Sequence, residues 1–185
     1  MSSEQLNPFS YVILTLVGRN GAGPHDLRRM AETGRIYWQA APSQWYAEPK
    51  RLAKLGYLDA EKLPGRTRER THYTLTGRGR EALAEWVRTP APLPRVQSEP
   101  IARLLAADLV PAENLLEGLE ALRGEIQEQL ELLDQGRERW TKSVPHRAEV
   151  LAVNVEWARR SLLLQLDWLE EAERTLRARK GATRR

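Results

Sequence analysis

The chain contains no cysteine and only three histidines, which are His25, His72 and His146. Without thiols it has no disulfides, no thiolate metal ligands and no cysteine nucleophile. The histidines lie in separate segments, and no His-x-x-x-His pair is present, so we expect no metal site and no cofactor. Glycine-rich phosphate loops, Gly-x-Ser-x-Gly elbows and kinase signatures are also absent. The sequence therefore predicts a protein that is not an enzyme.

Long apolar runs are missing as well. No stretch of 18 or more apolar residues is present, so no membrane span is expected. The segment from Met1 to Asn7 is polar and lacks the basic and then apolar layout of a secretory signal. We therefore expect a cytoplasmic protein. The 185 residues, 41% of them hydrophobic, are enough for one domain or two small ones.

Positive charge is concentrated in one short region. Residues 1–90 contain 14 basic and 9 acidic residues, whereas 91–185 contain 15 and 16. The segment 43–80 alone has 9 basic and 4 acidic residues, which accounts for the whole surplus of the first half. Binding of a phosphate backbone requires positive charge on one face, so this segment is the candidate for nucleic-acid contact.

The first half shows the pattern of a small, mainly helical domain. Apolar spacing and turn signals predict helices over 9–18, 25–32 and 44–55, strands over 57–63 and 70–75, and a helix over 77–88. Ser10 and Thr76 are expected to cap helices, and Gly56 is a natural helix stop. Pro49 lies inside the third helix, where it removes one hydrogen bond. Pro64 and Gly65 indicate a hairpin with a basic tip.

The second half is predicted to be helical. Three prolines within 89–94 mark a linker. Apolar residues then repeat every three or four positions from Leu115 to Leu133, and again after Pro145. The last helix has two apolar stripes, one including Leu162 and Leu169 and the other including Trp157 and Leu164. Such a helix needs partners on both sides, and we expect one of them to be a second copy of the chain.

We therefore predict a mainly α fold with a small β-hairpin. It consists of a winged helix-turn-helix domain over 1–89, a proline-rich linker over 90–98, a helical dimerisation domain of antiparallel helices over 99–178 and a basic disordered tail over 179–185. In helix-turn-helix proteins the recognition helix enters the major groove and its early residues meet base edges. A basic hairpin beside that helix grips the neighbouring phosphate backbone or minor groove.

The sequence resembles the PadR family of transcriptional regulators, in particular members with a long helical C-terminal half. The resemblance rests on five segments of the sequence. Three lie in the helical part, at 23–27, 37–46 and 51–58, and two lie in and after the hairpin, at 65–68 and at 73–76 followed by 79–83. It spans roughly residues 9–88. The family usually has a tyrosine where this chain has His25, and an uninterrupted helix around Pro49.

The resemblance implies a homodimeric repressor that binds operator DNA and is released by a small aromatic effector. The implied DNA contacts are Ser43, Gln44, Tyr46, Lys50 and Arg51 on the recognition helix, and Arg66, Arg68 and Arg70 on the wing. A Gln amide suits adenine, and hydroxyls suit bases or phosphates. Trp45 is expected to be part of the core instead.

The tryptophans of the second half leave the question of an effector open. Trp140, Trp157 and Trp168 are candidates for an effector pocket, but helix packing and a dimer seam are the favoured explanation for them. A regulator without a small-molecule ligand is one alternative. A winged-helix and coiled-coil module that binds protein is another, and the basic wing tip argues against it.

Overall fold

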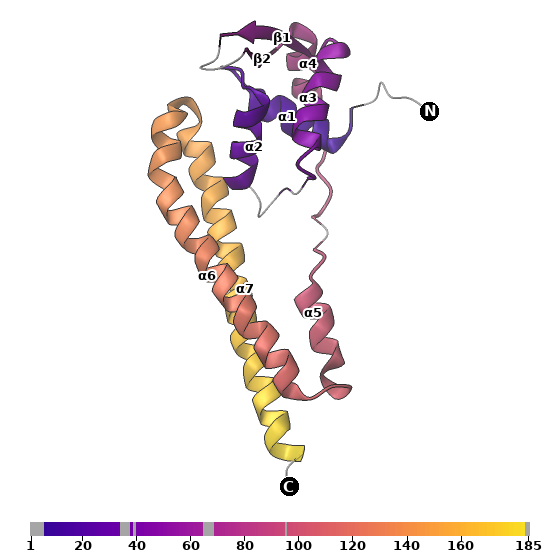
Figure 1. The fold of residues 1–185 in the computed structure, drawn as a ribbon, viewed down its shortest axis with the longest axis vertical. Coiled ribbons are helices and arrows are strands. Elements are labelled where there is room, and N and C mark those ends of the chain that lie inside the picture. Colours follow the sequence, from indigo (N-terminus) through magenta and orange to yellow (C-terminus); the bar gives the residue numbers. More distant parts are fainter. Residues whose placement is uncertain (1–5, 34–37, 39, 65–68, 95, 184–185) are drawn as a thin grey trace, which may run out of the picture. The chain divides into compact units, whose positions relative to one another are not determined.

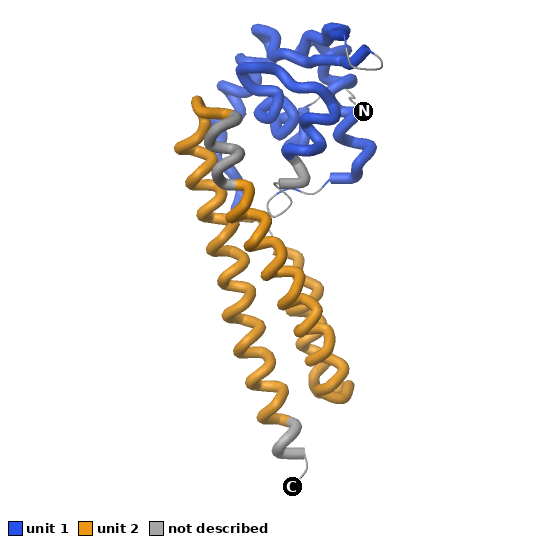
Figure 2. Tube along the Cα trace, turned by 60° about the vertical axis from the view of Figure 1, so that its left-hand side comes forward, with its two compact units in different colours: residues 1–93 blue, residues 94–185 orange. Residues whose placement is uncertain are grey.

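The computed structural model divides the chain into two compact units, residues 1–93 and 94–185 (Figure 2). The structure describes residues 6–33, 38, 40–64, 69–94 and 96–183. For residues 31–33, 137–143 and 180–183 it describes the backbone but not the side chains. Among the described residues, no helix contains an apolar stretch long enough to span a bilayer. Residues 90–94 and 96–98, on either side of the boundary between the units, have no regular secondary structure.

The described part of unit 1 contains three helices, a hairpin and a fourth helix, in the order that the sequence predicted (Figure 1). The elements are α1 (Pro8–Val17), α2 (Pro24–Thr33), α3 (Gln44–Lys54), β1 (Leu58–Leu63), β2 (Arg70–Leu75) and α4 (Gly77–Trp86). The predicted mainly α fold with one small hairpin is confirmed. Element boundaries differ from the predicted ones by at most two residues, as is usual at helix ends.

The hairpin is attached to the helices by one additional backbone pair. β1 and β2 are antiparallel, with Leu58 opposite Leu75 and Leu63 opposite Arg70. Ala22, in the turn after α1, forms an isolated antiparallel bridge with Tyr73. Two backbone hydrogen bonds of 3.0 Å join these residues, one in each direction. The base of the wing is therefore held against the α1–α2 turn.

The core of unit 1 lies between the helices and the inner face of the hairpin. Its buried hydrophobic residues are Ile13, Leu14, Val17, Ala22, Leu27, Trp45, Leu52, Leu58 and Tyr73. Trp45 is 4% exposed, which confirms that it is a core residue. The Trp45 and Phe9 rings are packed edge to face, with 4.9 Å between their ring centres, an arrangement that aromatic pairs favour. The core therefore fixes one side of α3 through its largest side chain.

The start of α1 differs from the prediction. Asn7 caps the helix instead of Ser10, because Pro8 provides a favourable first helical residue. The Asn7 side chain accepts a hydrogen bond from the Ser10 backbone N–H, and the Ser10 hydroxyl accepts one from the Asn7 backbone N–H. This reciprocal pair is a capping box. Ser10 itself is fully buried.

Unit 2 is a pair of long helices preceded by a short helical segment (Figure 1). Its elements are α5 (Glu99–Leu104), the 3₁₀ turns η1 (Leu105–Asp108) and η2 (Pro145–Arg147), and the helices α6 (Ala112–Ser143) and α7 (Ala148–Thr183). α6 and α7 run antiparallel along their length, joined by the turn at η2 (Figure 2). The segment that begins with α5 ends as the 3₁₀ turn η1 because Pro111 follows it.

The C-terminal end also differs from the prediction. We expected a disordered tail over 179–185, but α7 continues to Thr183. Ala178, Arg179 and Lys180 are strong helix formers, and only Gly181 is unfavourable in this segment. The helix therefore extends beyond the last apolar residue of its stripe, Leu176.

The two apolar stripes of α7 have different surroundings within the chain. Leu162, Leu169 and Leu176 are at most 5% exposed and face α6, where Leu119, Ile126 and Leu133 are also buried. On the other stripe, Val153 is 69% exposed, Trp157 51% and Leu164 68%. One stripe is therefore covered inside the chain, and the other is exposed.

We predict that Gly21→Ala destabilises unit 1 by about 2 kcal/mol or more. Gly21 has φ +72°, which costs other residues about 1–2 kcal/mol. A Cβ there would also lie 2.7 Å from the carbonyl oxygen of Tyr73, so the bridge to the wing would have to shift. Denaturant unfolding followed by circular dichroism measures the loss.

Gly124→Ala is the matched control for this experiment. A Cβ at Gly124, in the middle of α6, meets nothing within 4 Å, and alanine is favoured over glycine in helices by about 0.8–1 kcal/mol. This variant should be as stable as the wild type or more stable. Equal destabilisation by both substitutions would contradict the strain assigned to Gly21.

Candidate nucleic-acid interface

α3 presents a basic stripe to solvent. Ser43, Ala47, Lys50 and Lys54 are all exposed, and their spacing of four, three and four residues places them on one side of the helix. Tyr46, beside this stripe, is 43% exposed. The only acidic residue within α3 is buried on another side. The exposed side of α3 therefore has hydroxyls near its start and two ammonium groups further along.

The opposite side of α3 determines this orientation. Trp45, Pro49 and Leu52 are buried there, and Leu52 and Pro49 are among the fully buried side chains of the protein. Pro49 lacks the N–H that an interior helical residue donates. α3 nevertheless continues past it to Lys54, because the proline ring is packed into the core.

The first turn of α3 uses Gln44 within the protein. The Gln44 Oε1 atom accepts a hydrogen bond of 3.1 Å from the Ala41 backbone N–H. Bidentate pairing with adenine needs both the oxygen and the amino group of this side chain. The Oε1 atom of Gln44 is therefore engaged within the protein. Ser43, at the N-cap position, makes no side-chain capping bond.

Arg51 lies in a different environment from Lys50. Its guanidinium donates to both oxygens of the Glu48 carboxylate, at 2.9 Å from Nε to Oε2 and 2.6 Å from Nη2 to Oε1. Nη2 also donates to the Ser10 hydroxyl at 3.0 Å. The Arg51 side chain is 29% exposed. This predicted phosphate contact is therefore engaged with α1 and with its own helix.

The charges of this cluster are mutually stabilised. Burial by itself opposes ionisation of Glu48, but hydrogen bonds from Arg51 and Ser10 and the charge of Arg51 outweigh it, so the pKa of the Glu48 carboxyl is lowered. The hydrogen bonds to Glu48 likewise raise the pKa of Arg51, against the opposing effect of its burial. Both groups are charged at neutral pH.

The C-terminal end of α3 is held by the start of α4. Arg78 donates to the carbonyl oxygen of Leu55 at 2.8 Å and to the Tyr57 hydroxyl at 3.2 Å. Its guanidinium lies 4.4 Å from the centre of the Tyr57 ring, within cation–π range. The Thr76 hydroxyl donates to the carbonyl oxygen of Gly56 at 2.8 Å. A basic side chain at this helix end also complements the helix dipole.

The wing is only partly described. Arg66 and Arg68, two of the predicted contacts, lie outside the described residues. Arg70 begins β2 and is exposed. Lys62, on the neighbouring strand, is exposed as well and donates to the Thr71 hydroxyl at 3.0 Å. Arg70 and Lys62 therefore add exposed positive charge on the hairpin.

Sequence reasoning missed two basic residues of this surface, Lys54 and Lys62. Lys54 continues the spacing of Ser43, Ala47 and Lys50, so counting every exposed position of the helix would have found it. Lys62 had no such signal, because strand alternation alone does not distinguish a DNA-facing lysine from a solvated one.

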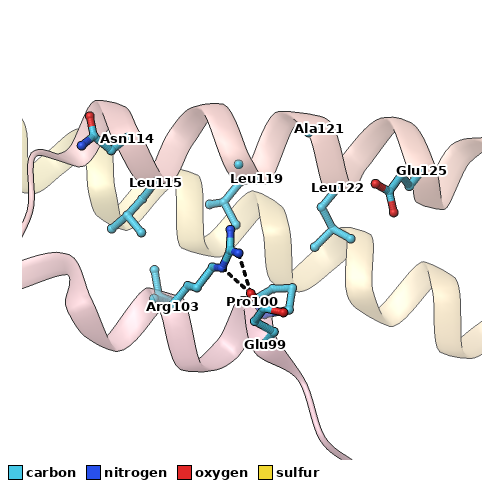
Figure 3. Close-up of a pocket in the computed structure, with 11 residues that line it drawn as sticks. Glu99, Pro100, Arg103, Asn114, Leu115, Leu119, Ala121, Leu122 and Glu125 are labelled. Carbon is cyan, nitrogen blue, oxygen red and sulfur yellow. Dashed lines mark hydrogen bonds and ion pairs between the residues drawn. The ribbon is translucent and has the colours of Figure 1, made fainter.

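The predicted effector residues do not gather at a described cavity. The side chain of Trp140 lies outside the described residues, Trp157 is half-exposed and Trp168 partly buried. A cavity of about 340 Å³ lies between α5 and α6 instead, with an ion pair between Arg103 and Glu99 at its edge (Figure 3). Its lining includes leucines of both helices and neither Trp157 nor Trp168. Among the described residues no group of side chains is arranged to hold a metal ion.

Solved structures resemble the chain over almost its full length, although no family model and no curated protein matches it. Bacillus subtilis PadR in complex with operator DNA is 22% identical, with a TM-score of 0.76 over 92% of this chain and 99% of that chain. The PadR-like regulator BC1756 from Bacillus cereus is 15% identical, with a TM-score of 0.80 over 95% of this chain and 99% of that chain.

A third neighbour is described as an activator. The Vibrio cholerae virulence activator AphA is 23% identical, with a TM-score of 0.64 over 94% of this chain and 98% of that chain. Bacillus subtilis PadR has also been solved with p-coumaric acid, at a TM-score of 0.68 and 22% identity over 91% of this chain and 98% of that chain.

The arrangement of unit 1 defines a winged helix-turn-helix protein, to which unit 2 adds a pair of long antiparallel helices. Within that class, the chain has the fold of the PadR and PadR-like transcriptional regulators. The resemblance drawn from the sequence is confirmed at the level of the fold.

We predict that the stability of unit 1 falls when Glu48 becomes protonated. Its folded pKa is lowered from the ordinary value of 4.5. The stability that its ionisation contributes is therefore fully present above about pH 4.5 and is lost as the pH falls through the folded pKa. Thermal melts of the wild type and Glu48→Gln between pH 7 and pH 3 measure this effect.

The difference in stability between the two proteins should be constant from pH 7 to about 5 and should narrow below about pH 4.5. If the difference in stability between the wild type and Glu48→Gln stayed constant down to pH 3, the ion pair between Glu48 and Arg51 would be contradicted.

Proposed function

We propose that this chain is a DNA-binding transcriptional regulator that places α3 in the major groove. The observation that carries the proposal is the exposed basic side of α3 in a winged helix-turn-helix fold. An α-helix fits the major groove, and its early residues meet base edges there. The Bacillus subtilis protein of the same fold has been crystallised with operator DNA. A cytoplasmic location, predicted from the sequence, suits this role.

Each exposed group of α3 has a proposed role in this arrangement. Ser43, the Gln44 amino group and Tyr46 lie at the start of the helix and meet bases or nearby phosphates. Lys50 and Lys54, further along, neutralise phosphates, as ammonium groups do without strict geometry. On the wing, Arg66, Arg68 and Arg70 are proposed to contact the neighbouring backbone or minor groove.

We also propose that the protein is a homodimer through unit 2. The supporting observation is the second stripe of α7, where Val153, Trp157 and Leu164 are more than half exposed. Exposed apolar patches rimmed by polar residues mark interaction sites, and most homo-oligomers are two-fold symmetric dimers. A dimer would present two α3 helices to half-sites about one helical turn apart.

The direction of regulation that we propose is repression, released by a small aromatic compound. The complex of Bacillus subtilis PadR with p-coumaric acid supports an aromatic effector. Trp140, Trp157 and Trp168 are the proposed ligand contacts. AphA, described as an activator, has the same fold, so the fold is compatible with either direction. Loss of the DNA complex on addition of p-coumaric acid would favour regulation by an aromatic ligand over regulation through the amount of this protein in the cell.

We predict that the protein shifts a DNA fragment from upstream of its own gene at nanomolar concentration in a gel-shift assay. Tyr46→Ala and Arg68→Ala should each weaken the complex at least tenfold, because one removes a groove contact and the other a wing contact. Val87→Glu in unit 1, distant in sequence from both segments, is the control and should still bind.

Salt dependence gives a second measurement of the same interaction. If about 6–10 phosphates are contacted, affinity should fall by about 10³–10⁵ between 50 and 200 mM salt. A flat salt response, or the absence of any bound fragment in an unbiased genomic selection, would refute the proposal of DNA binding.

We predict that Val153→Glu combined with Leu164→Glu separates the dimer into monomers. Two carboxylates on the exposed stripe of α7 would have to be buried without partners in the interface. Sedimentation equilibrium measures the mass. Val87→Glu is the matched control, since Val87 in unit 1 is 70% exposed and Val153 is 69% exposed. Dimers of unchanged affinity in the double variant would place the interface elsewhere.

A further inference from the structure

A cluster of three polar side chains, two of them buried, joins α1 to the middle of α3. Ser10 is fully buried and Glu48 is 9% exposed. The Ser10 hydroxyl donates to the Glu48 Oε1 atom at 2.6 Å. Arg51 donates to both carboxylate oxygens and to Ser10. The Ser10 oxygen also accepts from the backbone N–H of Asn7, so the cluster includes the cap of α1.

Every strong acceptor in this cluster is used. The Ser10 oxygen donates once and accepts twice, which is the hydrogen-bonding capacity of a hydroxyl. The Glu48 carboxylate receives three hydrogen bonds, two of them from a guanidinium in the side-by-side geometry that is strong and directional. A buried carboxylate is tolerated only when it is paired in this way. The cluster therefore has one arrangement that satisfies it.

A directional cluster constrains α3 in a way that apolar packing does not. A helix with its side chains has a radius of about 5–6 Å, so a rotation of about 20° about its axis moves a side-chain tip by about 2 Å. Apolar contacts of leucine and proline side chains have no preferred direction, so they hold α3 in the core without specifying polar partners. Hydrogen bonds vary by only about 0.5 Å in length, so the same rotation would break the contacts to Ser10.

We propose that Ser10, Glu48 and Arg51 set the rotation of α3 about its own axis, and with it the position of the exposed stripe in the groove. Arg51 is then a positioning residue that acts through Glu48 and Ser10, and phosphate contact is left to Lys50 and Lys54. This inference rests on the proposed function. It changes the role that the sequence analysis assigned to Arg51.

Two substitutions distinguish a positioning residue from a phosphate contact. Glu48→Gln removes a negative charge near the interface and would strengthen DNA binding if Arg51 contacted phosphate, because Arg51 would be released. It weakens recognition if the cluster positions α3. Arg51→Lys keeps the charge and would preserve a phosphate contact, but an ammonium cannot donate side by side to the carboxylate. A lysine at position 51 therefore cannot position α3 through Glu48.

The experiment compares two labelled duplexes by fluorescence anisotropy with the full-length protein. One duplex is the fragment from upstream of the protein's own gene, and the other has the same composition in shuffled order. For Glu48→Gln and for Arg51→Lys we expect the preference for the first duplex to fall about tenfold or more. Affinity for the shuffled duplex and its salt dependence should stay within about twofold of the wild type.

Lys50→Met is the matched control on the same helix. It should weaken binding to both duplexes and lower the slope of log affinity against log salt by about one. A variant that is only partly folded would lose affinity for both duplexes equally, so a selective loss reports on the position of α3. If Glu48→Gln melts below the assay temperature, Ser10→Ala replaces it, since it removes a single oxygen.

The outcomes separate the inference from the proposed function. Glu48→Gln binding as tightly as the wild type or more tightly, with Arg51→Lys keeping its preference, would overturn the positioning role and restore Arg51 as a phosphate contact. A wild type that prefers neither duplex would refute the proposed function, and the inference would be refuted with it.

Discussion

The placement of α3 depends on how one polar cluster is accommodated inside an apolar core. Glu48 lies on the same side of α3 as Trp45 and Leu52, where an unpaired carboxylate would cost several kcal/mol. Arg51 and the Ser10 hydroxyl remove that cost, and both come from positions that only the folded protein brings together. Together with the buried Trp45, Pro49 and Leu52, this cluster determines which residues of α3 face solvent.

The rest of unit 1 supports the same helix from its other end and from the wing. Arg78 and Thr76 hold the carbonyl groups that follow α3, and the pair between Ala22 and Tyr73 attaches the hairpin to the α1–α2 turn. A contact surface built on a rigid helix is more accurate than one built on a loop. Unit 1 is therefore a scaffold in which several specific polar contacts fix α3 or the hairpin next to it.

Unit 2 follows a different physical principle. Its stability comes from the apolar stripe shared by α6 and α7, and few specific polar contacts join the described parts of these helices, among them the ion pair of Arg123 with Glu173 at 2.8 Å. The second stripe of α7 is also apolar, but Val153, Trp157 and Leu164 on it are more than half exposed. A helix with apolar residues on two sides is expected to be buried on both sides. This is the physical basis for proposing that a second copy of the chain covers the second stripe.

The sequence by itself determined the order of the elements, the core role of Trp45 and the two stripes of α7, because these follow from the periods of local backbone geometry. It also located the basic segment. It did not determine the role of Arg51, since a basic residue on a recognition helix has the same local pattern whether it faces a phosphate or a buried carboxylate. Nor did it predict that Asn7 would cap α1 while Ser10 reached Glu48. The roles of Arg51 and Ser10 depend on contacts between residues 38 and 41 positions apart, and only the tertiary structure brings such residues together.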